Sequence, residues 1–288
     1  PPQPATLDAL LAELRLSISG FNQYLRCPLS FYYERVLRLP SVTSEYAAYG
    51  LAMHEALHRG FGQMLQHPER AFPPPEDFAR HFDRALKRRS ALFGEQAFRR
   101  YLEKGRHNLQ AYVLQQRDTW CKNVKLELLI RDAVVDGVPL IGIIDKVEFP
   151  EPGIAHVVDY KTGSHRADKL RPPSDKEPHG GPYWRQLVFY KLLYESASGK
   201  RGVVRSGEIA YLDPDKQGHF PTHPLELDAA AADFLRELLR ETYQRILDRQ
   251  FFEGCNEPHC HWCKLLNRQY ELGSLADALS EELDDPAR

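Results

Sequence analysis

Apolar residues recur every three or four positions through residues 17–122, and this spacing is typical of amphipathic helices. The segment Leu16-Ser17-Ile18-Ser19-Gly20 offers cap residues for the first of these helices, and Pro28 interrupts the pattern. The clearest apolar stripe runs from Met53 to Met64. The pattern predicts further helices over 49–65, 75–93, 95–121, 183–196 and 228–248.

The middle of the chain has a different pattern, with short Val and Ile runs that end in turn residues. Asp136-Gly137 and Pro152-Gly153 mark two turns, and the polar stretch 164–181 predicts a mobile loop. Strands are expected over 124–130, 140–149, 154–160, 207–212 and 220–225. This order of elements predicts an α/β or α+β fold, with a central mixed sheet flanked by helices and a helical N-terminal elaboration.

Composition adds little to the fold but limits the function. The 288 residues are 42% hydrophobic and 27% charged, as in ordinary globular proteins, and no apolar run is long enough to span a membrane. We therefore expect a cytoplasmic protein. A net charge of −2 means that affinity for nucleic acid must come from a local groove or from a partner domain. The chain begins Pro1-Pro2 without a Met, so we expect a piece of a longer protein.

Two acids follow apolar runs on neighbouring predicted strands. Asp145 ends an Ile run and Asp159 ends a Val run. Lys161 lies two residues after Asp159, so the alternation of a strand places both side chains on one face. Two carboxylates and a backbone carbonyl suit Mg²⁺ or Mn²⁺, which activates water for attack on phosphorus. Taken separately, the same residues would be ordinary polar residues at strand ends.

These motifs, with others in the same order, resemble the PD-(D/E)xK nuclease superfamily and in particular its RecB-like branch, which includes the nuclease domains of RecB and AddB. The matching pieces are Ser-Ile-Ser-Gly-Phe-Asn-Gln-Tyr-Leu-Arg-Cys-Pro at 17–28, Gly50-x-x-x-His54, Gly-Ile-Ile-Asp at 142–145, Asp-Tyr-Lys-Thr-Gly at 159–163 and Gln-Leu-Val-Phe-Tyr at 186–190. The resemblance implies a restriction-endonuclease-like core. We expect one nuclease domain over 1–288, with a mainly helical part at 17–122, the core at 123–250, and a cysteine cluster and acidic tail at 251–288.

The resemblance also implies roles for single residues. Asp145, Asp159, the Tyr160 carbonyl and His54 would bind the metal ion, and Lys161 would be the catalytic lysine. Gln186 and Tyr190 lie at i and i+4 of one helix, where the resemblance implies that they position the DNA backbone or the lysine. A purely structural hydrogen bond is the alternative for this pair. A lone His on a helix is usually only packed, and His58 shows how easily such residues occur. Glu127, on the first strand, is a weaker candidate acid.

Three cysteines within nine residues suggest a metal centre. Cys255-x4-Cys260-x2-Cys263 needs a fourth ligand, which Cys27 supplies if the two ends of the chain meet. This set resembles the [4Fe–4S] staple of AddB-type nucleases, although their extra cysteine usually follows the Cys-x2-Cys pair. A zinc site completed by His259 or His261 is the main alternative. Cys121 is expected to be an ordinary core or surface residue.

We therefore expect a divalent-metal-dependent deoxyribonuclease, an exonuclease rather than an endonuclease, that acts on single-stranded DNA ends. The resemblance implies that it works beside a helicase in DNA break repair and recombination. One alternative is a stand-alone CRISPR-associated RecB-like exonuclease, and another is a non-catalytic DNA-binding domain that keeps the fold and the cluster. The loop 168–179, with Arg166 and Lys169, is a candidate flap over the entering strand.

Overall fold

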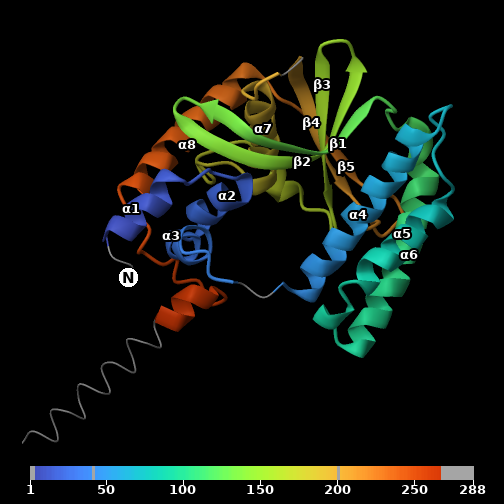
Figure 1. Cartoon of the computed structure of the whole chain (residues 1–288), viewed down its shortest axis with the longest axis horizontal. Helices are drawn as coiled ribbons and strands as arrows, with labels where there is room; N and C mark the ends of the chain where they lie inside the picture. The colour runs from blue at the N-terminus through green and yellow to red at the C-terminus, as the bar shows by residue number, and fades with distance from the viewer. Residues whose placement is uncertain (1–3, 41–42, 200–201, 267–288) are drawn as a thin grey trace, which may run out of the picture. The chain divides into compact units, whose positions relative to one another are not determined.

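The computed structural model describes residues 4–40, 43–199 and 202–266 (Figure 1). The predicted acidic tail lies mostly outside these residues. The chain divides into two compact units, one built from residues 1–41 and 239–288 and the other from residues 42–238. Whether the two act as one nuclease domain stays a prediction. No helix in the described ranges is long and apolar enough to cross a membrane.

The larger unit, residues 42–238, is built on a five-stranded sheet in the order β1-β2-β3-β4-β5. The strands are β1 (Val124–Val135), β2 (Val138–Glu151), β3 (Ile154–Lys161), β4 (Val203–Tyr211) and β5 (Thr222–Glu226). β3 and β4 are parallel and the other neighbours are antiparallel. This mixed sheet, with helices packed against it, confirms the predicted fold class.

β1 and β2 are longer than predicted because a tight turn joins them. Asp136 and Gly137 both have positive φ, 48° and 84°, which matches the two-residue turn whose twist suits a hairpin. The ladder can therefore continue to Val135 and Val138 at the turn itself. The turn itself was predicted, but the first strand was ended at Ile130, where the register shifts between Ile130 and Ala133 and interrupts the alternation.

Three helices pack as a layer on one side of this sheet: α4 (Glu45–Gln66), α5 (Pro75–Lys87) and α6 (Glu95–Gln116). Their buried residues form one core with Val158 and Tyr160 of β3 and with residues of β4. Gly60 lets α4 and α5 approach closely, since a Cβ there would lie 1.9 Å from the ring of Phe78. α5 ends earlier than predicted, and a 3₁₀ turn over Ser90–Leu92 leads to Gly94. α6 also ends early and continues as a 3₁₀ turn over Arg117–Thr119.

α7 (Pro182–Glu195) connects the parallel strands β3 and β4. It packs against the sheet, where Gly142 and Gly207 leave room for its leucines. The polar segment before it contains a 3₁₀ turn, η4 (Ala167–Leu170), and a bridge between Ser174 and Glu177. Its predicted mobility stays a prediction.

The smaller unit contains α1 (Pro4–Ala12), α2 (Ile18–Arg26), α3 (Pro28–Phe31), the π-helix η1 (Tyr32–Val36) and the end of α8 (Ala229–Leu247), within which the boundary between units falls. Of the cap residues that the segment 16–20 offers, Ser17 caps α2, and its side chain accepts from the Gly20 amide at 3.1 Å. Pro28 ends α2 and begins α3, which leaves Cys27 between the two helices. The Cys27 sulfur accepts from the Ser30 amide at 3.4 Å, so its position is held by the backbone.

Candidate active site and cysteine centre

The candidate catalytic acids lie where the ladder between β2 and β3 ends. Lys146 pairs with Val158, and the same register continued by one residue sets Asp145 opposite Asp159. Beyond this point the Tyr160 amide donates to Asp145 Oδ2 at 3.0 Å. The carboxylate thus takes the place of a strand carbonyl and holds the two separating strands together.

Lys161 and Asp159 are partners, as the strand alternation predicts. Lys161 Nζ lies 2.7 Å from Asp159 Oδ2. The other carboxylate oxygen, Oδ1, accepts from Gln186 Nε2 at 2.6 Å and from the Tyr190 hydroxyl at 3.0 Å. Gln186 Nε2 is also 2.9 Å from the Tyr190 hydroxyl, so one turn of α7 presents two donors to Asp159.

The structure therefore brings Gln186 and Tyr190 to the aspartate, rather than to the lysine. Asp159 is buried, and among the described residues its Oδ2 has no hydrogen-bond partner beside the ion pair with Lys161. A buried carboxylate oxygen with this lone partner has free lone pairs for a cation.

His54 reaches the site from α4. Its Nδ1 lies 3.3 Å from Asp145 Oδ2, and its ring packs edge-on against the Tyr160 ring at 6.0 Å between centroids. Gly50, one turn earlier, lies close to Thr162, because a Cβ there would be 3.3 Å from the Thr162 hydroxyl. The Gly-x-x-x-His spacing thus brings α4 against the end of β3 and aims the histidine at Asp145.

The turn after Lys161 is also held in place. Gly163 has a φ of 93°, which favours glycine, and its amide donates to Asp213 Oδ2 at 2.7 Å. Asp213 also accepts from Lys104 at 2.8 Å and from Asn108 at 2.6 Å. No sequence motif pointed to Asp213, because its partners come from α6 and from the turn after β3.

Burial and charge act in opposite directions on the two acids. Burial would raise the pKa of Asp145, but His54, the Tyr160 amide and Lys161 together lower it. Burial raises the pKa of Asp159, and the charge of Asp145 adds to this against the opposing effect of Lys161. Burial would lower the pKa of Lys161, but the charge of Asp159 outweighs it, so the lysine stays cationic. Neighbouring carboxylates with different pKa directions are typical of catalytic sites.

The donors present fit a hard divalent cation. The carbonyl of Lys161, the last residue of β3, accepts from the amide of Leu212, which follows β4, so this carbonyl lies on the edge of β3 that faces β4. Because strand carbonyls alternate in direction, the Tyr160 carbonyl faces β2, where the ladder has ended. Asp145, Asp159, the Tyr160 carbonyl and His54 therefore offer three oxygen donors and an imidazole, a set that suits Mg²⁺ or Mn²⁺.

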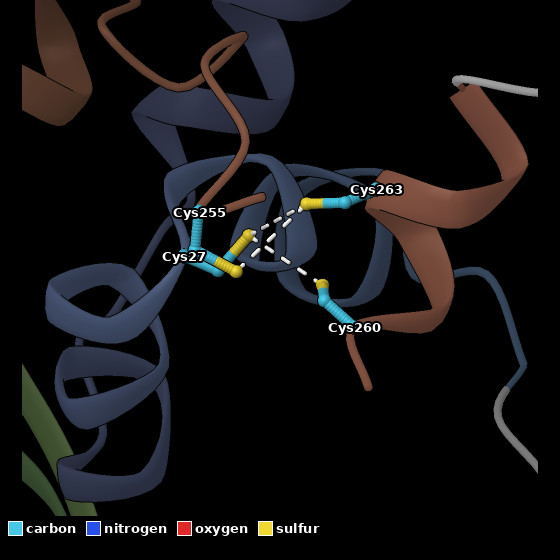
Figure 2. Close-up of side chains that lie close together, drawn as sticks. All are labelled: Cys27, Cys255, Cys260 and Cys263. Atoms are coloured by element: carbon cyan, nitrogen blue, oxygen red, sulfur yellow. Dashed lines mark hydrogen bonds between the residues drawn. The ribbon is translucent and has the colours of Figure 1, made fainter. Parts of the chain in front are cut away.

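The four cysteines of the smaller unit converge (Figure 2). The sulfur of Cys27 lies 3.8 Å from those of Cys260 and Cys263, and Cys255 lies 3.8 Å from Cys263. All four sulfurs lie within 4.8 Å of one another, and among the described residues this is the one group of at least three His, Cys, Asp or Glu found with such a geometry. The predicted meeting of Cys27 with the late cysteines, across 233 residues, is confirmed.

This arrangement suits a metal or cluster, because four cysteine sulfurs within 4.8 Å of one another can act as ligands to one centre. Burial raises the pKa of Cys27 and raises that of Cys263 to about 12, so binding a metal there would displace protons from these thiols. His259 and His261 are exposed and do not belong to the group. Cys121 is separate, as expected, and its sulfur donates to the Asn123 carbonyl at 3.5 Å.

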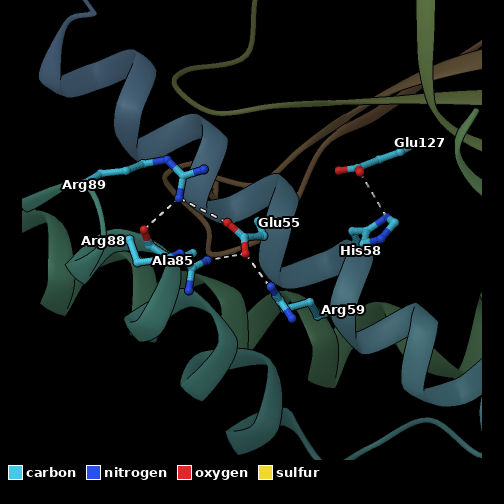
Figure 3. Close-up of polar contacts among 7 residues, drawn as sticks. All are labelled: Glu55, His58, Arg59, Ala85, Arg88, Arg89 and Glu127. Carbon is cyan, nitrogen blue, oxygen red and sulfur yellow. Dashed lines mark hydrogen bonds and ion pairs between the residues drawn. The ribbon is translucent and has the colours of Figure 1, made fainter. Parts of the chain in front are cut away.

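Sequence reasoning assigned little or no role to several charged residues near the site. His58 lies 3.5 Å from Glu127, and Glu55 forms ion pairs with three arginines (Figure 3). Glu127 has a φ of 43° and sits where β1 faces Asp145.

Of the candidate flap residues, Arg166 pairs with Asp168, and Lys169 lies over the Tyr183 ring. That ring also lies beneath Lys161, at 5.2 Å.

Comparisons with known proteins agree with the fold described above. Residues 15–268 match the family model of the PD-(D/E)XK nuclease superfamily. A solved structure from Eubacterium rectale, described as a candidate exonuclease, aligns over 92% of each chain with a TM-score of 0.54 and 11% identity, a likeness of fold alone. SSO0001 aligns over 83% of this chain and 85% of its own, with a TM-score of 0.29 and 13% identity, too weak to carry an argument. No curated protein matches the sequence.

Proposed function

Since the chain belongs to the PD-(D/E)XK nuclease superfamily, we propose that it is a deoxyribonuclease that hydrolyses phosphodiester bonds with Mg²⁺ or Mn²⁺. The observation that carries this proposal is the meeting of Lys161 with Asp159 at the point where Asp145 faces them. An amino group at 2.7 Å from a buried carboxylate, beside a second carboxylate, is the arrangement expected for water attack on phosphorus.

Four groups would hold the metal ion: the carboxylates of Asp145 and Asp159, the Tyr160 carbonyl and the His54 imidazole. When bound, the ion polarises a phosphoryl oxygen and lowers the pKa of the attacking water. Lys161 stays protonated beside Asp159 and can donate to the negative charge that develops on the phosphate.

The remaining polar groups position these residues. Gln186 and Tyr190 fix one oxygen of Asp159, which leaves the other oxygen toward Lys161. The Tyr160 amide orients Asp145, so the carboxylate is set by the backbone of β3. Such supporting hydrogen bonds determine how well a metal ligand performs.

The test compares the full chain with Lys161→Ala on labelled single-stranded DNA with Mn²⁺ or Mg²⁺. Cleavage by the parent that is lost in Lys161→Ala, and kept in the exposed Lys122→Ala control, supports the proposal. No cleavage by a folded parent would refute it and favour a binding domain that keeps the fold.

We propose further that the enzyme acts as an exonuclease on single-stranded ends and belongs to the RecB- or AddB-like group, beside a helicase in break repair. The early cysteine with three late ones supports this grouping, as does the order of the motifs. A strand delivered by a motor would also suit a net charge of −2. None of the five cysteines forms a disulfide, which suits a reducing cytoplasm.

For the cysteine centre we propose a [4Fe–4S] cluster with a structural role. A group of four cysteines that includes no histidine among the described residues favours it over a mixed Cys/His zinc site, although an all-cysteine zinc site has the same ligands. Iron, sulfide and zinc analysis of anaerobically purified protein separates the two. Zinc without sulfide would refute the cluster.

A further inference from the structure

A groove of about 820 Å³ opens beside His54 and Asp145 and follows one side of α4. The α4 residues that line it run from Leu51 to Gln66. At 1.5 Å per residue this is about 22 Å of helix, which is long enough to run beside several nucleotides of a strand. The groove is therefore continuous with the candidate metal site and long enough for a polynucleotide.

Positive charge gathers at one wall of this groove, where α4 meets the end of α5 (Figure 3). Glu55 binds Arg59 at 3.0 Å and Arg89 at 3.1 Å, and it also binds Arg88. Arg89 donates in addition to the Ala85 carbonyl at 2.7 Å. One carboxylate among three guanidinium groups leaves an excess of positive charge, and it fixes the arginines in a defined geometry.

His81 adds an unsatisfied polar group to the same wall. Both of its ring nitrogens are buried, and neither has a hydrogen-bond partner among the described residues. Burial lowers the pKa of His81, and the charges of Arg59 and Arg84 lower it further. A buried polar group without a partner is costly, so a ligand or water that enters the groove would be expected to satisfy it.

Apolar side chains also line the groove. Leu51 is 54% exposed and Ile143 is 51% exposed, and both line the groove beside the candidate metal site. Guanidinium groups together with exposed apolar side chains suit a nucleic acid strand, which carries phosphates along its backbone and apolar faces on its bases.

We propose that this groove binds the strand that enters the active site, with Arg59 and Arg89 contacting backbone phosphates and Glu55 holding them in place. The inference rests on the proposed nuclease function and assigns its substrate a path. Arg59 and Arg89 place positive charge locally on the proposed path, whereas Glu127 and Asp145, which also line the groove, are acidic.

The test measures binding of a fluorescein-labelled oligothymidylate in a Lys161→Ala background with Mg²⁺, across a range of salt. Arg59→Gln/Arg89→Gln should weaken binding by roughly tenfold or more at low salt and reduce the slope of log Kd against log salt by about 1.4, from about 0.7 per lost phosphate contact. The control Arg99→Gln/Arg100→Gln removes the same charge from α6, outside the groove, and should leave the slope unchanged.

Glu55→Gln provides a second variant with the opposite expected sign. It frees the three arginines, so binding should tighten and the salt slope should steepen, which a folding defect cannot produce. Equal slopes for parent, groove variant and control would overturn the inference. If the parent cleaves DNA but these slopes are equal, only the groove assignment fails. If Arg59 and Arg89 govern binding but the parent cleaves nothing, only the nuclease proposal fails.

Discussion

The hydrogen bond from Tyr190 to Asp159 gives the sharpest test of how the site is held. Tyr190→Phe removes one hydroxyl, 3.0 Å from Asp159 Oδ1, and keeps the volume of a side chain that is only 3% exposed. Gln186 remains as a donor at 2.6 Å, so the carboxylate loses one of its two hydrogen bonds at this oxygen. The perturbation is therefore a change in the support of Asp159 with little change in packing.

A hydrogen bond to a charged group contributes about 1.5–3 kcal/mol, and about 1.4 kcal/mol corresponds to a factor of ten. We expect the Mn²⁺ concentration for half-maximal activity to rise by about 10- to 100-fold in Tyr190→Phe. Burial already raises the pKa of Asp159, and the loss of a donor to its ionised form raises it further. More of the carboxyl group is then protonated at low pH, so the acidic limb of the pH–rate profile should move to higher pH.

The assay is the initial rate of single-strand cleavage against Mn²⁺ concentration, repeated at several pH values. Tyr194→Phe is the matched control, because Tyr194 is a buried tyrosine one turn later on α7 and is not a donor to Asp159. An unchanged half-saturation in Tyr190→Phe, or the same change in Tyr194→Phe, would refute the reasoning.

Three further predictions concern stability. Gly60→Ala should destabilise the fold by about 1–3 kcal/mol, because its Cβ would lie 1.9 Å from Phe78. Gly62→Ala has open space around it and should be neutral or stabilising by up to about 1 kcal/mol. Chemical denaturation measures both changes in the free energy of unfolding. Burial would raise the pKa of Glu55, but its arginine partners lower it below 4.5. The contribution of Glu55 to stability is therefore present above pH 4.5 and lost as pH falls through the lowered pKa. The difference in unfolding free energy between parent and Glu55→Gln should shrink over that range. A constant difference would contradict this prediction. Cys27→Ser should lose the bound iron or zinc and lower the melting temperature, whereas Cys121→Ser should retain the metal, as elemental analysis and calorimetry would show.

Local patterns predicted most of the elements but not their ends. The order of helices and strands could be predicted because apolar residues recur every three or four positions in a helix and every second position in a strand. The strands of the β1–β2 hairpin were predicted too short, because a register shift between Ile130 and Ala133 interrupts the alternation before the predicted turn. α5 and α6 were predicted too long, because both change to 3₁₀ turns within segments whose composition does not change.

The candidate site divides in a similar way. The pairing of Lys161 with Asp159 followed from alternation along one strand. The partner of Gln186 and Tyr190 did not, because residues on one helix face can be known to lie together without showing what they face. The Glu55 cluster was missed as well, since two of its arginines come from the neighbouring helix end.

By itself the sequence determined which chemical groups are available and which of them share a strand or a helix face, because backbone geometry sets those relations over a few residues. Only the tertiary structure decided that His54 meets Asp145, that β2 and β3 separate at the two acids, and that Cys27 meets Cys260. These contacts join elements far apart in the chain, and their geometry follows from the packing of whole helices and strands. A change of one residue in register or a small shift of a helix would undo them without altering any local pattern.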